Sequence, residues 1–422
     1  MQHQAHFLET ASLIGARLCR DAIWDGSRCN WLGSSMELLF NNWALAERSF
    51  GPDLYGGTSG IALFLARLYQ IVQEPFYQKT ASGAMQQALS RLEDVQPEFS
   101  GGFYSGLPGI AYSAICLGNL FDRQDWIHKG LQILKTEASK ALNPPSLDVS
   151  TGVAGTIPTL LVLYKQYPED FLLQTAIQLG EHLLATARKS NLGWSWQTLQ
   201  KQETQQPDLT GFSHGAAGIA WALLELYRTT HRQPFRVAAE EGFRYEQHWF
   251  NPEQENWPDL RQAQNSSRNA ANGDGQWGYA IAWCHGAPGI GLSRLRAYEI
   301  LENDDYLQQA EAALRTTVRM LNQTSQQENY SLCHGVAGNA ELLLYADRVL
   351  GRPEYRTVAE RVGNFGIQQY EQNRIPWPCG VMGGGETPNL MLGLAGIGHF
   401  YLRLYDSVTV PSVVIILPEW PE

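Results

Sequence analysis

Short apolar segments recur along the chain, and each begins directly after the two glycines of a Gly-x-x-Gly motif. In the segments 61–68 and 219–226, hydrophobic residues stand at nearly every position. A helix that is apolar around most of its circumference is a buried helix. The motif occurs seven times, at residues 57–60, 106–109, 152–155, 215–218, 286–289, 335–338 and 393–396. The pattern therefore predicts seven repeats, each with one buried helix.

The segments between these motifs show a different pattern, in which apolar residues fall mostly three or four positions apart. In 306–321, the residues Leu307, Ala310 and Leu314 belong to one stripe, which is typical of an amphipathic helix with one buried face. Similar helices are predicted elsewhere, at 78–92, 126–142, 171–187, 235–249 and 355–370. The segment 7–23 is predicted to supply the outer helix of the first repeat.

Fourteen helices in seven pairs predict an all-α chain that folds as a single domain over residues 1–422. Such pairs either stack openly as a solenoid or close into an (α/α)7 toroid. We favour closure because every glycine turn precedes the more apolar helix, so that all turns would gather at one rim. Glycine there allows a positive φ and a close backbone approach. The N-termini of the inner helices would direct their positive dipole ends at a central cavity.

Two of the spacings between motifs are long, and the additional residues lie near 191–210 and 252–276. The second insertion is polar and rich in turn-forming residues, so the sequence leaves open whether these insertions are substrate-binding flaps or solvated loops. The last apolar stretch, 410–417, is rich in Val and Ile and has the composition of a β-strand. It is expected to form an extended strap packed on the body of the protein.

Composition and charge narrow the choice of function. The formal net charge is -11, which argues against nucleic-acid binding because such proteins carry a basic surface. No stretch approaches the roughly 18 apolar residues that cross a bilayer, and residues 1–6 lack the basic and apolar regions of a signal peptide. The six cysteines show no disulfide framework, so reduced thiols and a cytoplasmic location are expected.

A Cys-His pair precedes two of the glycine motifs, as Cys284-His285 and as Cys333-His334. The two cysteines occupy equivalent positions in adjacent repeats, so their sulfurs are expected to meet in a closed ring. Two thiolates and the imidazole of His334 suit one Zn²⁺ per chain and leave a fourth coordination position open, as in catalytic zinc sites. Burial as small apolar residues is the alternative for the cysteines. For His285, a role around the metal, in the cavity or in packing stays open.

Two further polar residues precede other glycine motifs. His214, in Ser213-His214-Gly215, shares the same rim, and its pKa near neutrality makes it a candidate general acid or base. A capping or packing role is the alternative. Asp148, ahead of the third motif, either orients a catalytic group or a water molecule, or caps a turn. On the sequence alone, both interpretations of Asp148 remain open.

Taken together, these motifs resemble the lanthionine synthetase C-like family over nearly the whole chain. Three segments carry the resemblance within the seven glycine repeats: Trp283-Cys284-His285-Gly286, Cys333-His334-Gly335 and Ser213-His214-Gly215. The resemblance is strongest to the cyclase domain of class II bifunctional lanthipeptide synthetases. That domain opens with a segment like 53–57 and closes with one like 402–413.

The resemblance implies an α/α toroid with a zinc ion at its centre, held by Cys284, Cys333 and His334. It also implies that His214 acts in proton transfer and that Asp148 assists. The implied reaction is an intramolecular thia-Michael addition within a dehydrated precursor peptide. A Cys thiol of the peptide adds to dehydroalanine or dehydrobutyrine and closes a lanthionine or methyllanthionine ring. The family resemblance also favours a monomer.

Two features depart from the family pattern. Stand-alone cyclases commonly carry Arg four residues before the first zinc-ligating Cys, whereas this chain has Ala280 at that position. A role of that Arg in stabilising the enolate is therefore absent or served elsewhere. The class II cyclase normally follows a dehydratase domain, for which 422 residues leave no room. We therefore expect either an excised domain or a stand-alone cyclase that works with a separate dehydratase.

Three other functions compete with that of a zinc-dependent cyclase. A non-catalytic peptide-binding scaffold would keep the zinc for stability alone, and another type of family member would add glutathione to dehydroamino acids in proteins. The third alternative, from analogy of fold, is an α/α-toroid glycosidase. Such an enzyme needs two carboxylates that flank a cavity. Just ahead of the rim motifs, only Asp53 and Asp148 occur, and they stand in non-adjacent repeats.

Overall fold

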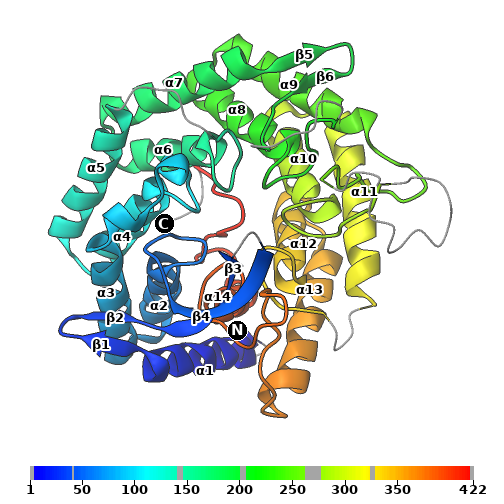
Figure 1. Cartoon of the computed structure of the whole chain (residues 1–422). Coiled ribbons are helices and arrows are strands. Elements are labelled where there is room, and N and C mark those ends of the chain that lie inside the picture. Colours follow the sequence, from blue (N-terminus) through cyan, green and yellow to red (C-terminus); the bar gives the residue numbers. More distant parts are fainter. Residues whose placement is uncertain are drawn as a thin grey trace.

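Two concentric rings of helices form the body of the protein (Figure 1). The computed structural model describes residues 4–39, 42–139, 146–199, 206–261, 277–323 and 328–418. The inner helices begin at the glycine motifs: α2 (Thr58–Val72), α4 (Leu107–Leu120), α6 (Val153–Gln166), α8 (Ala216–Thr230), α10 (Ala287–Leu301), α12 (Val336–Leu350) and α14 (Leu394–Tyr405). The outer helices are amphipathic: α1 (Ala5–Asp21), α3 (Pro75–Leu89), α5 (Gln124–Ala138), α7 (Asp170–Thr186), α9 (Gln233–His248), α11 (Asp304–Leu321) and α13 (Pro353–Gly366). The predicted all-α toroid of seven helix pairs is confirmed.

The way in which helices pair differs from the sequence prediction. Each outer helix packs mainly against the inner helix that precedes it in the chain, as α3 does against α2. The segment 7–23 is therefore not the outer helix of the first repeat, and that prediction was wrong. Helix α1 packs instead on α14, the last inner helix, where the rings of Phe7 and Tyr401 lie 6.1 Å apart. The first and last helices thus close the ring (Figure 1).

The second glycine of every motif is required by a close backbone approach. A Cβ atom at this position would lie between 1.8 and 2.2 Å from the carbonyl oxygen of the residue six positions earlier in all seven repeats. At Gly109, for example, the oxygen is that of Phe103 and the distance is 1.9 Å. A positive φ does not explain why glycine occupies these positions, because among the motif glycines only Gly286 has a positive φ, at 89°. Close approach therefore explains the motif better than left-handed backbone conformation.

Replacing Gly109 by Ala is expected to destabilise the protein by about 1–3 kcal/mol, the usual cost of overpacking, because backbone atoms cannot move aside cheaply. Gly101→Ala is the matched control in the same loop region, since its Cβ would find its nearest neighbour at 3.8 Å. Urea unfolding of both variants measures the difference. Equal free energies of unfolding for the two variants would contradict this explanation of the motif.

The C-terminal segment 410–417 lies inside the ring rather than on its outer surface. Val414 is buried, and its carbonyl accepts a hydrogen bond from Trp283 Nε1 at 2.8 Å, while the Val413 carbonyl accepts one from the Tyr104 hydroxyl at 2.6 Å. The segment packs on the body of the protein, as expected, but residues 413–415 form a bend and the segment joins no sheet among the described residues. It packs beneath the rim loops and closes the toroid from the side opposite the glycine turns.

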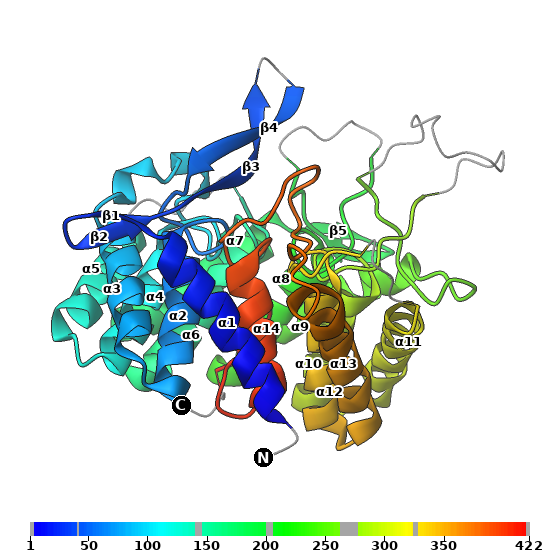
Figure 2. The ribbon, with the colours of Figure 1, turned by 90° about the horizontal axis from the view of Figure 1, so that it is seen from below.

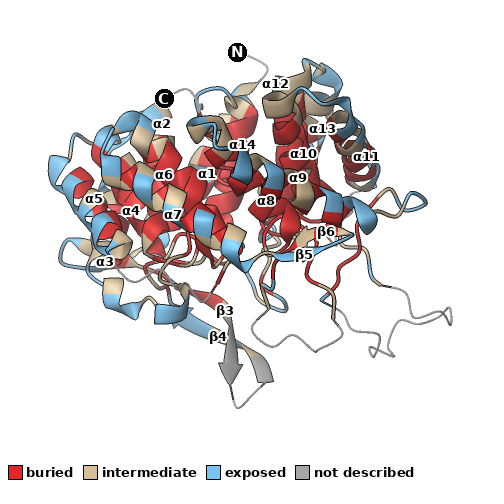
Figure 3. Ribbon diagram, turned by 90° about the horizontal axis from the view of Figure 1, so that it is seen from above, coloured by how far each residue is buried: buried red, intermediate tan, exposed pale blue. Residues whose placement is uncertain are grey.

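Three β-hairpins, which were not predicted from the sequence, lie in loops that connect the helices. They pair β1 (Ile23–Asp25) with β2 (Arg28–Asn30), β3 (Leu32–Leu39) with β4 (Asn42–Ser49), and β5 (Arg188–Ser190) with β6 (Gly193–Ser195), all antiparallel. The β3–β4 hairpin extends beyond the ring at the end opposite the N-terminus (Figure 2). The buried residues lie between the two rings of helices and at the rim (Figure 3). Among the described residues, every helix is too short or too polar to cross a bilayer.

The two predicted insertions are described in part. The segment 191–210 contains β6, and Thr198 donates its hydroxyl to the carbonyl oxygen of His214 at 2.6 Å, so this insertion packs against the rim. In the other insertion, Trp257 and Asp259 are buried. Residues 200–205 and 262–276 lie outside the described residues, as does any flap that they form.

Candidate active site

The residue two positions before the first glycine of each motif forms part of a circle of backbone hydrogen bonds. We call these seven the rim residues: Tyr55, Tyr104, Ser150, Ser213, Cys284, Cys333 and Met391. In six cases, the N–H of one rim residue donates to the carbonyl of the next one round the ring, at 2.9–3.3 Å. Cys284 donates to Cys333, and Cys333 donates to Met391. The repeats therefore bring equivalent side chains together at one end of the toroid.

Cys284 and Cys333 are neighbours on this rim, where the N–H of Cys284 donates to the carbonyl oxygen of Cys333 at 3.3 Å. A hydrogen bond between their thiols lowers the pKa of Cys284 against the effect of burial, and the positive charge of Arg261 lowers it further. The same hydrogen bond, together with burial, raises the pKa of Cys333 well above its ordinary value. The phenol of the rim residue Tyr55 faces the Cys333 sulfur. Of the two thiols, Cys284 therefore has the lower pKa.

His334 lies at the edge of this thiol pair. Its Nε2 hydrogen-bonds to the carbonyl oxygen of Gly380 at 2.9 Å, so Nδ1 remains for another partner. A metal-binding His usually donates its second ring nitrogen to a carbonyl or carboxylate in this way. Among the described residues, however, no three His, Cys, Asp or Glu side chains are gathered closely enough to hold a metal ion. The structure brings together the two predicted sulfur ligands but not all three predicted ligands.

His214 and Asp148 form a hydrogen-bonded pair beside the thiols. His214 Nδ1 lies 2.6 Å from Asp148 Oδ2. The other oxygen, Oδ1, accepts the backbone N–H groups of Thr151 at 2.6 Å and of Gly152 at 3.0 Å. Asp148 therefore caps a turn and orients His214 at once, so both sequence interpretations of this residue apply. The pairing leaves His214 Nε2 to exchange a proton.

Burial alone would lower the pKa of His214, but the charge and hydrogen bond of Asp148 more than offset it, so the pKa lies above its ordinary value of 6.5. Protonated His214 thus contributes stability that is fully present below pH 6.5 and is lost as the pH rises through the raised pKa. Asp148→Asn is expected to bring the His214 pKa below 6.5, because burial remains while the charge is gone.

NMR titration of the His214 ring measures this change. Asp53→Asn is the control. Asp53 Oδ1 caps an equivalent turn by accepting the N–H of Gly56 at 2.7 Å, but among the described residues Asp53 forms no hydrogen bond with His214. An unchanged His214 pKa in Asp148→Asn would show that the carboxylate does not set the charge of the imidazole.

His285, whose role the sequence left open, is 1% exposed. Neither ring nitrogen has a hydrogen-bond partner of ordinary geometry among the described residues. Burial and the charge of Arg261 lower its pKa to about 3, so the ring is neutral. Its centroid lies 5.7 Å from that of His214. His285 thus lies as a neutral ring beside the ring of His214.

Two charged residues that the sequence analysis missed also belong to this region. Arg261 forms an ion pair with Asp259, with Nη2 and Oδ2 2.6 Å apart. Glu246 of α9 is buried and accepts the N–H groups of Gly211 at 3.0 Å and Ala217 at 2.9 Å, one on each side of His214. Neither residue stands in a glycine motif, so the repeat pattern carried no signal for them.

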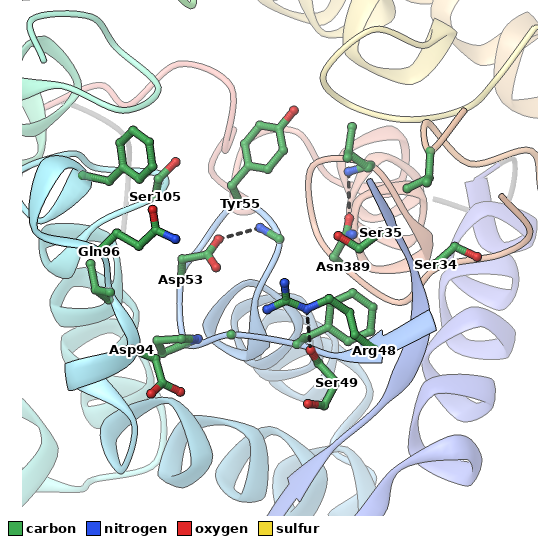
Figure 4. Close-up of a pocket in the computed structure, with 18 of the residues that line it drawn as sticks. Ser34, Ser35, Arg48, Ser49, Asp53, Tyr55, Asp94, Gln96, Ser105 and Asn389 are labelled. Carbon is green, nitrogen blue, oxygen red and sulfur yellow. Dashed lines mark hydrogen bonds between the residues drawn. The ribbon is translucent and has the colours of Figure 1, made fainter. Parts of the chain in front are cut away.

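A pocket of about 1160 Å³ reaches the rim at Tyr55 and His334, which belong to its lining, whereas Cys284, Cys333 and His214 do not. The remainder of its wall comes from the base of the β3–β4 hairpin and from rim loops (Figure 4). Hydroxyl, amide and carboxyl groups predominate among the labelled side chains, such as Ser34, Ser49, Asp53, Gln96, Ser105 and Asn389.

Comparison with known proteins places the chain in a family. The family model described as lanthionine synthetase C-like protein matches residues 48–415. The nisin biosynthesis protein NisC of Lactococcus lactis subsp. lactis is 24% identical over 327 residues, which are 72% of this chain and 76% of that protein. The lacticin 481/lactococcin biosynthesis protein LcnDR2 of the same organism is 23% identical over 89% of this chain, but the match spans only 38% of that longer relative.

Other relatives widen the range of activities. The glutathione S-transferase LANCL1 of Danio rerio is 23% identical over 83% of this chain and 81% of that protein. Among solved structures, the nisin cyclase covers 86% of this chain and 90% of its own, with a TM-score of 0.65 and 20% identity. A GH76 α-mannanase of Bacteroides thetaiotaomicron covers 95% of this chain and 96% of its own, with a TM-score of 0.52 and 11% identity. These two structural likenesses show the fold alone.

The match to the family model extends over most of the chain and includes the seven glycine motifs, both Cys-His pairs and His214. The family resemblance seen in the sequence is therefore confirmed, and this chain belongs to the lanthionine synthetase C-like family.

Proposed function

We propose that this protein is a zinc-dependent lanthipeptide cyclase, which forms a carbon–sulfur bond within a dehydrated precursor peptide. The observation that carries the proposal is the position of Cys284 and Cys333 as hydrogen-bonded neighbours on a rim that also holds the His214–Asp148 pair. Family membership supports it, since two of the relatives are named for lanthipeptide biosynthesis. A separate dehydratase would have to supply the dehydroamino acids of the peptide.

The donor set at the rim fits zinc. Cys284 and Cys333 are neighbours on the rim, and His334 adjoins Cys333 with one ring nitrogen held by the Gly380 carbonyl. These three residues would hold the zinc ion and leave one position for a substrate thiol. When bound there, zinc supplies Lewis acidity that favours a thiolate at neutral pH.

The protein's own residues provide the remaining chemistry. The sulfur of the peptide Cys bonds to Cβ of dehydroalanine or dehydrobutyrine, the electrons of the double bond move to the carbonyl oxygen, and Cα then takes up a proton. His214 is placed to deliver this proton from Nε2, because Asp148 holds Nδ1 and raises the pKa of the ring. The thiol proton leaves to solvent, so that the addition is balanced overall.

The pocket of about 1160 Å³ is the proposed binding site for the peptide. Positive and negative side chains are balanced in its lining, which contains Arg48, Arg91, Asp53 and Asp94. Its many hydroxyl and amide groups suit a peptide backbone, which offers both donors and acceptors. The non-catalytic scaffold that the sequence left open does not explain why Asp148 orients His214 and raises the pKa of its ring at the same rim.

A second function is favoured by one specific observation, the similarity to the glutathione S-transferase LANCL1. The same rim would serve that reaction if the added thiol came from glutathione rather than from the peptide itself. The glycosidase alternative finds less support, because Asp148 is engaged with His214 while Asp53 caps the turn at Gly56.

The two reactions separate in one experiment. Purified, zinc-loaded protein is incubated with a dehydrated peptide that contains one Cys, with and without glutathione, and free thiols are then alkylated before mass spectrometry. A cyclase protects the peptide Cys from alkylation without any change in mass. A glutathione-adding enzyme leaves that Cys reactive and increases the peptide mass by one glutathione. If zinc is bound and the peptide shows neither protection of its Cys nor a gain in mass, the non-catalytic scaffold is supported instead.

A further inference from the structure

The proposed addition places negative charge on a carbonyl oxygen. None of the residues assigned so far keeps a permanent positive charge to meet it, because His214 gives up its proton in the same reaction. Position 280, where stand-alone cyclases commonly carry Arg, is Ala in this chain. The backbone around Ala280 is nevertheless in contact with a charged segment. The side chain of Asn256 donates to the Ala280 carbonyl at 3.0 Å and accepts the N–H of Ala287 at 2.8 Å.

That segment, residues 256–261, is fastened on both sides of the rim. Asp259 donates its N–H to the Gly278 carbonyl at 2.7 Å. Toward the His214 repeat, the Pro258 carbonyl accepts the hydroxyl of Thr210 at 2.6 Å, and the Leu260 carbonyl accepts the amide of Gln206 at 2.9 Å. The segment therefore bridges the loop that carries His214 and the loop that carries Cys284.

Arg261 ends this bridge, and its guanidinium is held in a defined orientation. Nε donates to Oδ1 of the buried Asp259 at 2.9 Å, and Nη2 donates to Oδ2 at 2.6 Å, in a two-pronged pair. Among the described residues, Nη1 has no acceptor, and 45% of the side chain is exposed. Because its segment joins the loop of His214 to the loop of Cys284, Arg261 brings its charge to this rim, where that charge opposes protonation of His214.

We propose that Arg261 is a catalytic residue of the addition, whose guanidinium donates a hydrogen bond from Nη1 to the carbonyl oxygen of the dehydroamino acid as the thiolate attacks Cβ. The inference rests on the proposed cyclase function. In this arrangement a residue of the insertion near 252–276 supplies the charge that Ala280 lacks. Asp259 is then a positioning residue, which acts by holding Arg261.

The test compares wild type, Arg261→Ala, Arg261→Lys and Arg123→Ala, using the full chain, zinc and a dehydrated peptide with one Cys. Arg123 is the matched control, because it forms the same two-pronged pair with Asp125, at 2.8 and 2.6 Å, on an exposed part of the outer ring. We expect Arg261→Ala to lower kcat about 10²–10³-fold, the usual cost of one oxyanion-stabilising donor. Arg261→Lys keeps the charge and is expected to recover part of kcat, while Arg123→Ala behaves as wild type.

Two further readouts separate catalysis from structure. Zinc content and melting temperature of Arg261→Ala should equal those of wild type, and added guanidinium ion should restore part of its kcat. The inference is overturned if wild type cyclises the peptide and Arg261→Ala keeps kcat within about twofold, or if only KM changes. Loss of zinc or of the fold in both Arg261 variants would also overturn it, because the residue would then be structural. If zinc-loaded wild type itself fails to cyclise, it is the proposed function that fails.

Discussion

Replacing Cys284 or Cys333 by Ser is expected to lower the rate of peptide cyclisation by about 10³-fold or more. The reason is that Lewis-acid stabilisation contributes several kcal/mol to such reactions, and each ~1.4 kcal/mol corresponds to a factor of ten in rate. Serine keeps nearly the same volume, so the rim should pack as before, but its oxygen is a much poorer ligand for zinc than a thiolate. The measurement is the initial rate of loss of alkylatable thiol from a dehydrated peptide.

The control for these variants is Cys116→Ser. Cys116 lies on α4 in the lining of a separate pocket, near Arg67 and the end of the C-terminal strap. Its substitution removes a thiol of similar burial without touching the rim, so the cyclisation rate should stay close to that of wild type. Activity that survives in both Cys284→Ser and Cys333→Ser would show that the thiol pair has no part in the reaction.

Replacing His214 by Asn is expected to lower kcat by about 10²–10⁴-fold, the range that one general acid or base contributes. The Asn amide can still donate a hydrogen bond to Asp148, so the turn that Asp148 Oδ1 caps through Thr151 and Gly152 should stay intact. The zinc content should not change. A loss of activity with metal retained would therefore locate the defect in proton transfer.

The stereochemistry of the product gives a second readout for His214. Delivery of the proton by a fixed imidazole sets the configuration at Cα, whereas protonation by solvent yields a mixture of the two epimers. His214→Asn should therefore give slower cyclisation and mixed stereochemistry, while His128→Asn, on the exposed face of α5, should give neither. A single epimer formed at the wild-type rate in His214→Asn would rule out this role.

The seven-pair toroid was predictable because two independent patterns agreed, namely the recurring glycine motifs and the amphipathic segments between them. The glycine motifs recur at every inner helix, and the structure shows a close backbone contact behind each second glycine. The pairing of α1 with α14 was not predictable from the repeat, because order along the chain is the same whether an outer helix packs forward or backward. Only ring closure, a property of the whole chain, decides which partner the first helix finds.

The candidate site was predictable where it depends on the repeat. Cys284, Cys333 and His214 were found from their place before a glycine motif, and Tyr55 stands at an equivalent position that the same reasoning would have reached. Arg261 and Glu246 were missed because they come from an insertion and an outer helix, whose side chains reach the rim only through tertiary packing. The single-domain organisation over residues 1–422 and the monomeric state stay predictions.

The most direct test of the proposed zinc site is the zinc content of the purified, metal-replete protein in wild type and in the double variant Cys284→Ser/Cys333→Ser. A zinc site formed by Cys284, Cys333 and His334 predicts about one zinc per chain in wild type, none in the double variant, and an unchanged zinc content in Cys116→Ser. Cobalt substituted for zinc would report sulfur ligation by its absorption, independently of any catalytic assay. A folded wild type that binds no zinc, or a double variant that binds it as well as wild type, would contradict the central claim.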